Sequence, residues 1–173
     1  LSQESEEISE AEKEFLMALV KSCCKNICDF RAQEGEALKQ EFEKLIFGLK
    51  DMLEQIGTFE HDRVTAIRER MNKALKELDT AAVDQNRLEQ EMIFYIEKLD
   101  ISEEKMRLGN HLDYFLETMV IERTGKKLGF IAQEIGREIN TLGSKSNHAQ
   151  MQKIVVDMKD SLEKIKEQVL NTL

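Results

Sequence analysis

The sequence predicts an all-α protein in which a long N-terminal helical arm is followed by a helical bundle. The 173 residues include no proline and only 8 glycines, and a long chain without proline favours helices because proline breaks them. Apolar residues also recur at steps of three and four along most of the chain, which is the helical period. Together these observations predict the fold class.

The arm is predicted over residues 1–57, where one apolar stripe is interrupted only around Glu34 and Gly35. An unbroken helix of about fifty residues would be about 70 Å long. A small domain cannot cover such a stripe, so we expect the arm to form a homo-oligomer with further copies of the chain. The stripe consists of Ile8, Phe15, Leu19, Cys23, Ile27, Phe30, Leu38, Phe42, Leu45, Leu49, Met52 and Ile56.

Residues 58–173 are predicted to form the bundle. Its helices are separated by polar or glycine-containing turns, which supply caps and terminators. We expect helices from about Phe59 to Leu78, from an N-cap at Asp84 to Lys98, from a cap at Asp100 or Ser102 to Glu122, from Lys126 to Leu142 with Gly143 as its terminator, and from Ser146 to Asn171.

The net charge of −9, from 25 basic and 34 acidic residues, argues against non-specific nucleic-acid binding by the whole surface. Between Arg123 and Lys145, however, the sequence has five basic and only two acidic residues, which makes a local basic patch. No apolar run approaches the roughly 18 residues that a membrane span needs, and no signal peptide opens the chain. We therefore expect a cytoplasmic protein without a membrane partner.

Three cysteines, Cys23, Cys24 and Cys28, lie in one helical stretch. An odd number of cysteines in one helix makes a poor disulfide framework, and a zinc site would need a fourth ligand from elsewhere. We interpret them as small, reduced core residues.

Two expected helices carry the candidate chemistry. Glu104, Arg107 and His111 share one helical face, and Glu134 and Glu138 lie four residues apart on a later helix. Carboxylates at this spacing repel each other unless a cation lies between them, so the pattern is typical of a Mg²⁺ or Mn²⁺ site. A histidine nearby could serve as a general acid or base. The alternative is a solvated surface, on which Asn140 and Lys145 cap a helix end.

Long segments of the chain resemble the YicC family. They are FRAQEGEALKQEF (30–42), RLEQEMIFYIEKLDISEEKMRLGNHLDYF (87–115), GKKLGFIAQEIGREINTLGSKSN (125–147) and LEKIKEQVLN (162–171). The resemblance implies a bacterial, metal-dependent endoribonuclease that cleaves single-stranded RNA and assembles as ring-like oligomers.

The polar pattern of that family matches this sequence at Arg31, Glu34, Gly35, Gln90, Glu91, Asp100, Glu103, Glu104, Arg107, His111, Gln133, Glu134, Arg137, Glu138, Asn140, Thr141, Ser144 and Lys145. The resemblance implies metal ligands at Glu104, Glu134 and Glu138, and catalytic roles for His111, Glu104 and Glu138. Together with the local basic patch, it implies an RNA-binding set of Arg107, Lys126, Lys127, Arg137, Asn140, Ser144 and Lys145.

Two positions depart from the family, which usually has Asp where this chain has Gly129 and Asn where it has Gly136. A missing carboxylate would weaken a metal site if that Asp is a ligand. Family members are also longer, with a separate N-terminal domain, and this chain starts at Leu1 rather than Met. We therefore expect a fragment or a processed form.

Two classes of function follow. The first is the endoribonuclease, in which the helix from Ser102 packs antiparallel to the helix ending at Leu142. Glu103, Glu104 and Arg107 would then lie near Glu138 and Thr141, with His111 nearer Glu134. The second is a non-catalytic RNA-binding, oligomerisation or adaptor module, in which the polar cluster is structural.

Overall fold

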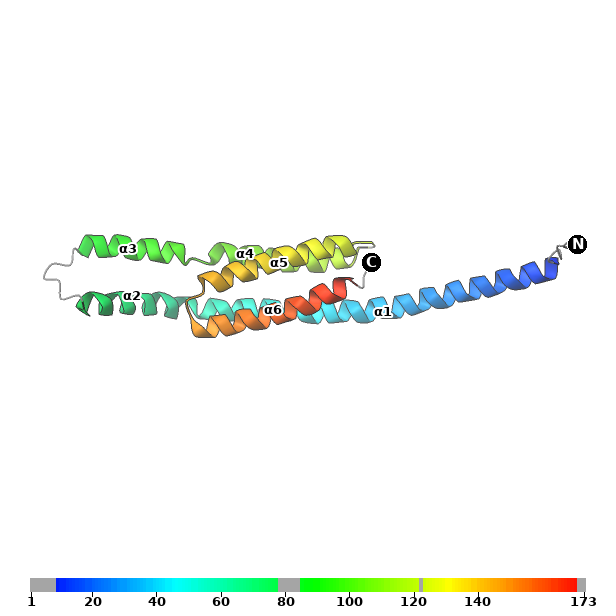
Figure 1. The fold of residues 1–173 in the computed structure, drawn as a ribbon, viewed down its shortest axis with the longest axis horizontal. Coiled ribbons are helices and arrows are strands. Elements are labelled where there is room, and N and C mark those ends of the chain that lie inside the picture. Colours follow the sequence, from blue (N-terminus) through cyan, green and yellow to red (C-terminus); the bar gives the residue numbers. More distant parts are fainter. Residues whose placement is uncertain (1–8, 78–84, 122, 171–173) are drawn as a thin grey trace, which may run out of the picture. The chain divides into compact units, whose positions relative to one another are not determined.

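The computed structural model describes residues 9–77, 85–121 and 123–170. The described residues form six α-helices, which confirms the predicted all-α class (Figure 1). They are α1 (Glu10–Thr58), α2 (Glu60–Glu77), α3 (Gln85–Lys98), α4 (Ser102–Met119), α5 (Gly125–Lys145) and α6 (Ala149–Val169). The predicted cap Asp84 lies outside the described residues. No helix among the described residues is long and apolar enough to cross a membrane.

The chain divides into two compact units, Leu1–Gln40 and Glu41–Leu173, and α1 contributes residues to both. The division falls earlier than the predicted boundary after residue 57. Four apolar residues near the end of α1 explain the difference, because they are buried in the second unit: Phe42, Ile46, Leu49 and Ile56. The last part of the predicted arm therefore belongs to the bundle.

The first unit begins with a capping box, in which side chains satisfy the free N–H groups of the first helical turn. The backbone N–H of Glu12 donates to the hydroxyl of Ser9 (3.3 Å), and the backbone N–H of Ser9 donates to the Glu12 carboxylate (2.9 Å). The hydroxyl of Ser9 also donates to the Glu12 carboxylate (2.7 Å), and this hydrogen bond, followed by the one from the Ser9 backbone N–H, holds the pKa of Glu12 below its ordinary value. The start of α1 is thus specified locally.

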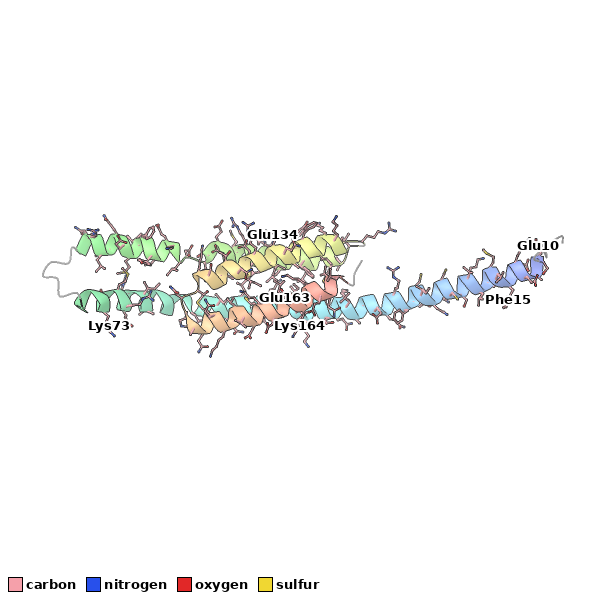
Figure 2. The ribbon with its side chains drawn as sticks, viewed as in Figure 1. Glu10, Phe15, Lys73, Glu134, Glu163 and Lys164 are labelled. Carbon is pink, nitrogen blue, oxygen red and sulfur yellow. The ribbon has the colours of Figure 1, made fainter. Side chains whose placement is uncertain are left out.

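The apolar stripe of the first unit is exposed. The side chain of Phe15 is 68% exposed and projects from α1 (Figure 2), and that of Phe30 is 62% exposed. The prediction that Cys23, Cys24 and Cys28 are core residues was wrong, because all three are exposed. None of residues 9–37 has a buried side chain. Helical periodicity therefore identified the apolar stripe, but no other described part of this unit packs against it.

The core of the second unit lies between the end of α1 and helices α4, α5 and α6. The rings of Phe42 and Phe115 pack edge to face at 5.4 Å, and Lys50 forms an ion pair with Asp113, so the end of α1 packs on α4. Helix α5 contacts both α4 and α6 (Figure 1). The central side chains are fully buried: Leu108, Leu112, Ile135, Ile139, Leu142 and Met158.

Helix α4 ends at Met119 instead of continuing to Glu122. The hydroxyl of Thr124 donates to the carbonyl oxygens of Thr118 (3.0 Å) and Ile121 (2.8 Å), and Arg123 has a positive φ of 59°. A tight turn with satisfied carbonyls therefore replaces the expected last turn of the helix.

The prediction that Gly143 terminates α5 was also wrong, because the helix continues to Lys145 and no described glycine has a positive φ. Side chains satisfy the carbonyls at this helix end instead. The hydroxyl of Ser146 donates to the carbonyl of Leu142 (2.6 Å), and the amide of Gln152 donates to the carbonyls of Gly143 (2.6 Å) and Ser146 (2.7 Å). A left-handed glycine cap is not needed here.

Three of the four glycines of α5 instead face α6. A Cβ atom added at Gly129, Gly136 or Gly143 would lie 3.7, 3.1 or 3.0 Å from a side-chain atom of Val169, Leu162 or Val155, respectively. Successive glycines are seven residues apart and so are their partners, which run in the opposite direction. We call this contact the glycine seam. Both positions at which we expected the family to carry a different residue, Gly129 and Gly136, lie in it.

Candidate functional site

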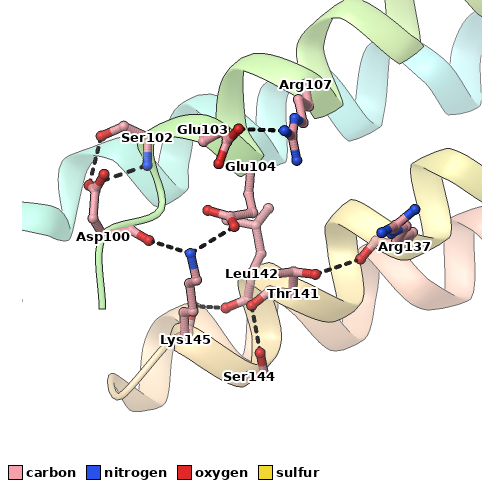
Figure 3. A network of polar contacts seen from close by, with 11 residues as sticks. Asp100, Ser102, Glu103, Glu104, Arg107, Arg137, Thr141, Leu142, Ser144 and Lys145 are labelled. Carbon is pink, nitrogen blue, oxygen red and sulfur yellow. Dashed lines mark hydrogen bonds and ion pairs between the residues drawn. The ribbon is translucent and has the colours of Figure 1, made fainter. Parts of the chain in front are cut away.

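The first turn of α4 meets the last turn of α5 through one lysine. The ammonium Nζ of Lys145 lies 2.7 Å from Oε1 of Glu104 and 2.9 Å from the carbonyl oxygen of Asp100 (Figure 3). This contact confirms the predicted antiparallel pairing, since the start of one helix meets the end of the other. It joins two residues that the sequence placed in different roles, a metal ligand and an RNA contact.

The Glu104 carboxylate is buried, with only 5% of the residue exposed, whereas the Lys145 side chain is 31% exposed. The second carboxylate oxygen, Oε2, has no hydrogen-bond partner among the described residues. A buried polar atom without a partner is destabilising by about 1–3 kcal/mol. The fold therefore holds a carboxylate that is only half satisfied by the protein.

Asp100 fixes the start of α4. The N-cap position is occupied by Ile101, and the carboxylate of Asp100 accepts hydrogen bonds from the hydroxyl (2.8 Å) and backbone N–H (3.3 Å) of Ser102. The hydrogen bond from the Ser102 hydroxyl is the main reason that the pKa of Asp100 lies below its ordinary value. Asp100 thus presents its backbone carbonyl, rather than its carboxylate, to Lys145.

A second buried carboxylate, Glu138, lies on the same side of α5 as Lys145, because seven residues make two helical turns. On α4, which runs antiparallel to α5, His111 lies seven residues after Glu104. The antiparallel register therefore sets His111 level with Glu138, about 10 Å along the helix pair from Glu104. Neither His111 nor Glu138 forms a hydrogen bond or ion pair with a described side chain.

The remaining charged residues of this face are more exposed. Glu103 and Arg107 form an ion pair along α4, and both side chains are more than half exposed. On α5, Glu134 lies 3.9 Å from Arg137, and their side chains are 50% and 75% exposed. Exposed pairs of this kind add little to stability. They leave both arginines accessible to a ligand.

The polar residues near the end of α5 differ in what they can offer. The hydroxyl of Thr141 donates to the carbonyl of Arg137 (3.1 Å), and that of Ser144 donates to the carbonyl of Thr141 (2.9 Å) (Figure 3). These hydroxyls are used within the helix, as is common for Ser and Thr in helices. Asn140 is exposed. The predicted RNA contacts Ser144 and Lys145 are thus both engaged by the protein itself.

Lys126 and Lys127 begin the same helix and are exposed. The ammonium of Lys127 lies 4.7 Å from the centre of the Tyr114 ring, a cation–π contact. Lys145 lies nineteen positions after Lys126, which is about 28 Å along a helix. The basic patch read from the sequence is therefore divided between the two ends of α5.

The three predicted metal ligands, Glu104, Glu134 and Glu138, follow the α4–α5 contact without converging. Among the described residues, no group of three or more His, Cys, Asp or Glu side chains is arranged to hold a metal ion. Mg²⁺, however, is usually bound by only one or two carboxylates together with water and substrate phosphates. The unpartnered oxygen of Glu104 fits that requirement.

An open groove that the sequence did not predict lies on the other side of α4. It has a volume of about 620 Å³ and is lined by residues of α1 and α4: Lys50, Leu53, Glu54, Gly57, Ser102, Lys105 and Met106. Ser102, which binds Asp100, lies on its wall. Only the pairing of α1 with α4 creates this groove, so no motif could have indicated it.

Comparison with known proteins gives the family. The model of the C-terminal region of YicC-like endoribonucleases matches residues 56–172. A probable endoribonuclease YicC from Clostridioides difficile is 36% identical over 146 residues, which are 83% of this chain and 50% of that protein. A probable endoribonuclease YicC from Haemophilus influenzae is 32% identical over 155 residues, which are 84% of this chain and 52% of that protein. The chain thus spans about half the length of these relatives. It belongs to the YicC-like endoribonuclease family, whose C-terminal region it contains.

Proposed function

We propose that this chain carries the catalytic site of a metal-dependent endoribonuclease that cleaves single-stranded RNA in the bacterial cytoplasm. The observation that carries the proposal is the Glu104 carboxylate, which is buried and retains one unpartnered oxygen within the family-matched region. A stabilising element would be expected to satisfy both oxygens. A carboxylate held ready but incompletely bonded is what a cation site requires.

In this proposal Glu104 is the principal ligand for Mg²⁺ or Mn²⁺, and the phosphate groups of RNA complete the coordination. Such a metal ion would activate water and neutralise charge on the phosphate. Glu138 and the more exposed Glu134 continue the carboxylate face along α5. His111, level with Glu138, is the proposed proton donor or acceptor.

The exposed cations bind the RNA backbone. Arg107 and Arg137 flank the carboxylate face, and Lys126 and Lys127 extend the contact to the other end of α5. Because the net charge is −9, this attraction is local, so binding should weaken with salt and depend on these residues.

The test is cleavage of a labelled single-stranded RNA with Mn²⁺ or Mg²⁺ and with EDTA. Glu104→Gln should reduce the cleavage rate at least 100-fold, because the amide keeps the shape but loses the charge that binds a cation. Glu117→Gln, at an exposed position of the same helix, is the matched control and should cleave normally. Full activity of Glu104→Gln with an intact helical spectrum would contradict the proposal.

The exposed stripe of α1 favours a second candidate, a homo-oligomerisation or adaptor module. Large apolar side chains with at least half their area exposed are costly to leave in water, so we propose that further copies of the chain cover Leu19, Ile27 and Phe30. Light scattering should show a species larger than a monomer that Ile27→Glu dissociates. Ser22→Glu, also exposed on α1, is the control. A monomer at tens of micromolar would remove this candidate.

A further inference from the structure

The ammonium of Lys145 lies in the kind of oxygen environment that a divalent cation prefers. Its two partners are a carboxylate oxygen of Glu104 and the backbone carbonyl oxygen of Asp100. Carboxylate and carbonyl oxygens are the ligands that hard cations such as Mg²⁺ and Mn²⁺ take in proteins. A positive charge is thus already present beside Glu104, supplied by the protein itself (Figure 3).

The two members of this pair are held with different firmness. Glu104 is confined, with a side chain that is 7% exposed and an oxygen that no described group satisfies. Lys145 lies in the last turn of α5, is 31% exposed, and has a flexible four-carbon stem that reaches solvent. Lys145 can therefore leave the pair far more easily than Glu104 can.

We infer that Lys145 is an internal cation that competes with a divalent metal ion for Glu104. The inference rests on the proposed function and adds regulation to it. While Lys145 holds Glu104, the chain binds metal weakly. Phosphate groups of RNA offer the ammonium another acceptor, so RNA and metal ion each favour the binding of the other.

The affinity for Mn²⁺ tests the competition directly. The concentration of free Mn²⁺ can be measured by electron paramagnetic resonance in the absence of RNA and of any cleavage reaction. Lys145→Met removes the ammonium and keeps the apolar stem. It should bind Mn²⁺ about tenfold more tightly than the natural chain, since one charge-assisted hydrogen bond no longer has to be broken. Lys166→Met, which removes a lysine paired with the exposed Glu163, is the control and should not change the affinity.

A second variant guards against misfolding of the first. Lys145→Arg keeps the charge and offers a guanidinium that binds carboxylates through two hydrogen bonds, so Mn²⁺ binding should become weaker than in the natural chain. Adding Glu104→Gln to Lys145→Met should abolish the gain. Mn²⁺ affinity that is unchanged or lower in Lys145→Met, or absent throughout the series, would overturn the inference.

Chemical labelling gives an independent readout of the same exchange. Acetylation of Lys145, followed by mass spectrometry, should accelerate when Mn²⁺ is added, whereas acetylation of Lys166 should not. Unchanged labelling of Lys145 at saturating Mn²⁺ would contradict the competition.

RNA cleavage distinguishes this inference from the proposed function. If the variants show the expected order of Mn²⁺ affinities but the natural chain cleaves no RNA, the inference holds and the proposed function is wrong. A metal-dependent nuclease with equal Mn²⁺ affinities keeps the proposal and loses the inference.

Discussion

On the side of α5 that faces α6, glycines recur every seven residues and let a valine or leucine of α6 approach the backbone closely. On the side that faces α4, positions with the same spacing are Glu138 and Lys145, and Glu104 packs against the latter. One helix thus has a side built for close apolar packing and a side that carries a buried carboxylate, Glu138, and a partly exposed lysine, Lys145. Because buried charges rarely increase stability over apolar residues, we interpret the α4 side as kept for function.

The largest loss of stability is expected from truncating a side chain of α6 that packs on a glycine of α5, because a glycine has no side chain that could fill the resulting cavity. Leu162 is 2% exposed and faces Gly136, so Leu162→Ala should lower the free energy of unfolding by about 3 kcal/mol. Leu170→Ala, at a residue 72% exposed, should change it little. Urea denaturation measures both, and equal effects would show that the α6 side does not depend on close packing.

Two alanine substitutions in the glycine seam should change the free energy of unfolding in opposite directions. Gly143→Ala would place Cβ 3.0 Å from Val155, a stiff β-branched residue, and should destabilise the fold by about 1 kcal/mol. Gly129→Ala meets Val169 at an ordinary 3.7 Å and should stabilise the fold by about 0.5–1 kcal/mol through helix propensity. Gly48→Ala, with open space around it, is the control for propensity alone. The same sign for all three would contradict the close approach.

Much of the fold was predictable from these patterns, because apolar period and glycine position are local signals. The helix expected from Ser146 to Asn171 corresponds to α6, and Met151, Met158 and Leu162, which recur at helical steps, are buried in it. The end of α5 was not predictable, since it depends on Gln152 of another helix bonding its carbonyls. The exposure of Cys23 was missed because periodicity indicates an apolar face without indicating what covers it.

For the candidate site, the sequence predicted the antiparallel pairing of two helices but not their register. The expected register set Glu104 near Glu138, whereas the structure pairs Glu104 with Lys145. The observed register sets Glu138 one heptad away. It also places Gly129 on the α6 side, so the carboxylate that we expected from the family at this position would not face α4.

A smaller effect is expected from pH. The pKa of Asp100 is lowered chiefly by the Ser102 hydroxyl, so its carboxylate stabilises the fold above the unfolded-state pKa of about 4. That contribution is lost as the pH falls through the lower, folded-state pKa. The natural chain should therefore be more stable than Asp100→Asn at pH 6, and the difference should shrink as the pH falls below about 4. A difference independent of pH would contradict this role.

The comparison of the two sides of α5 is tested most directly by replacing the charge pair with apolar residues of similar length. In Glu104→Met/Lys145→Met, we expect the free energy of unfolding to stay within about 1 kcal/mol of the natural value, or to rise, because the desolvation of Glu104 and its unpartnered oxygen are removed together. RNA cleavage by the same protein should be lost. A double variant that loses more than about 2 kcal/mol of stability, or that still cleaves RNA, would contradict the account, because the pair would then be a structural element of the bundle.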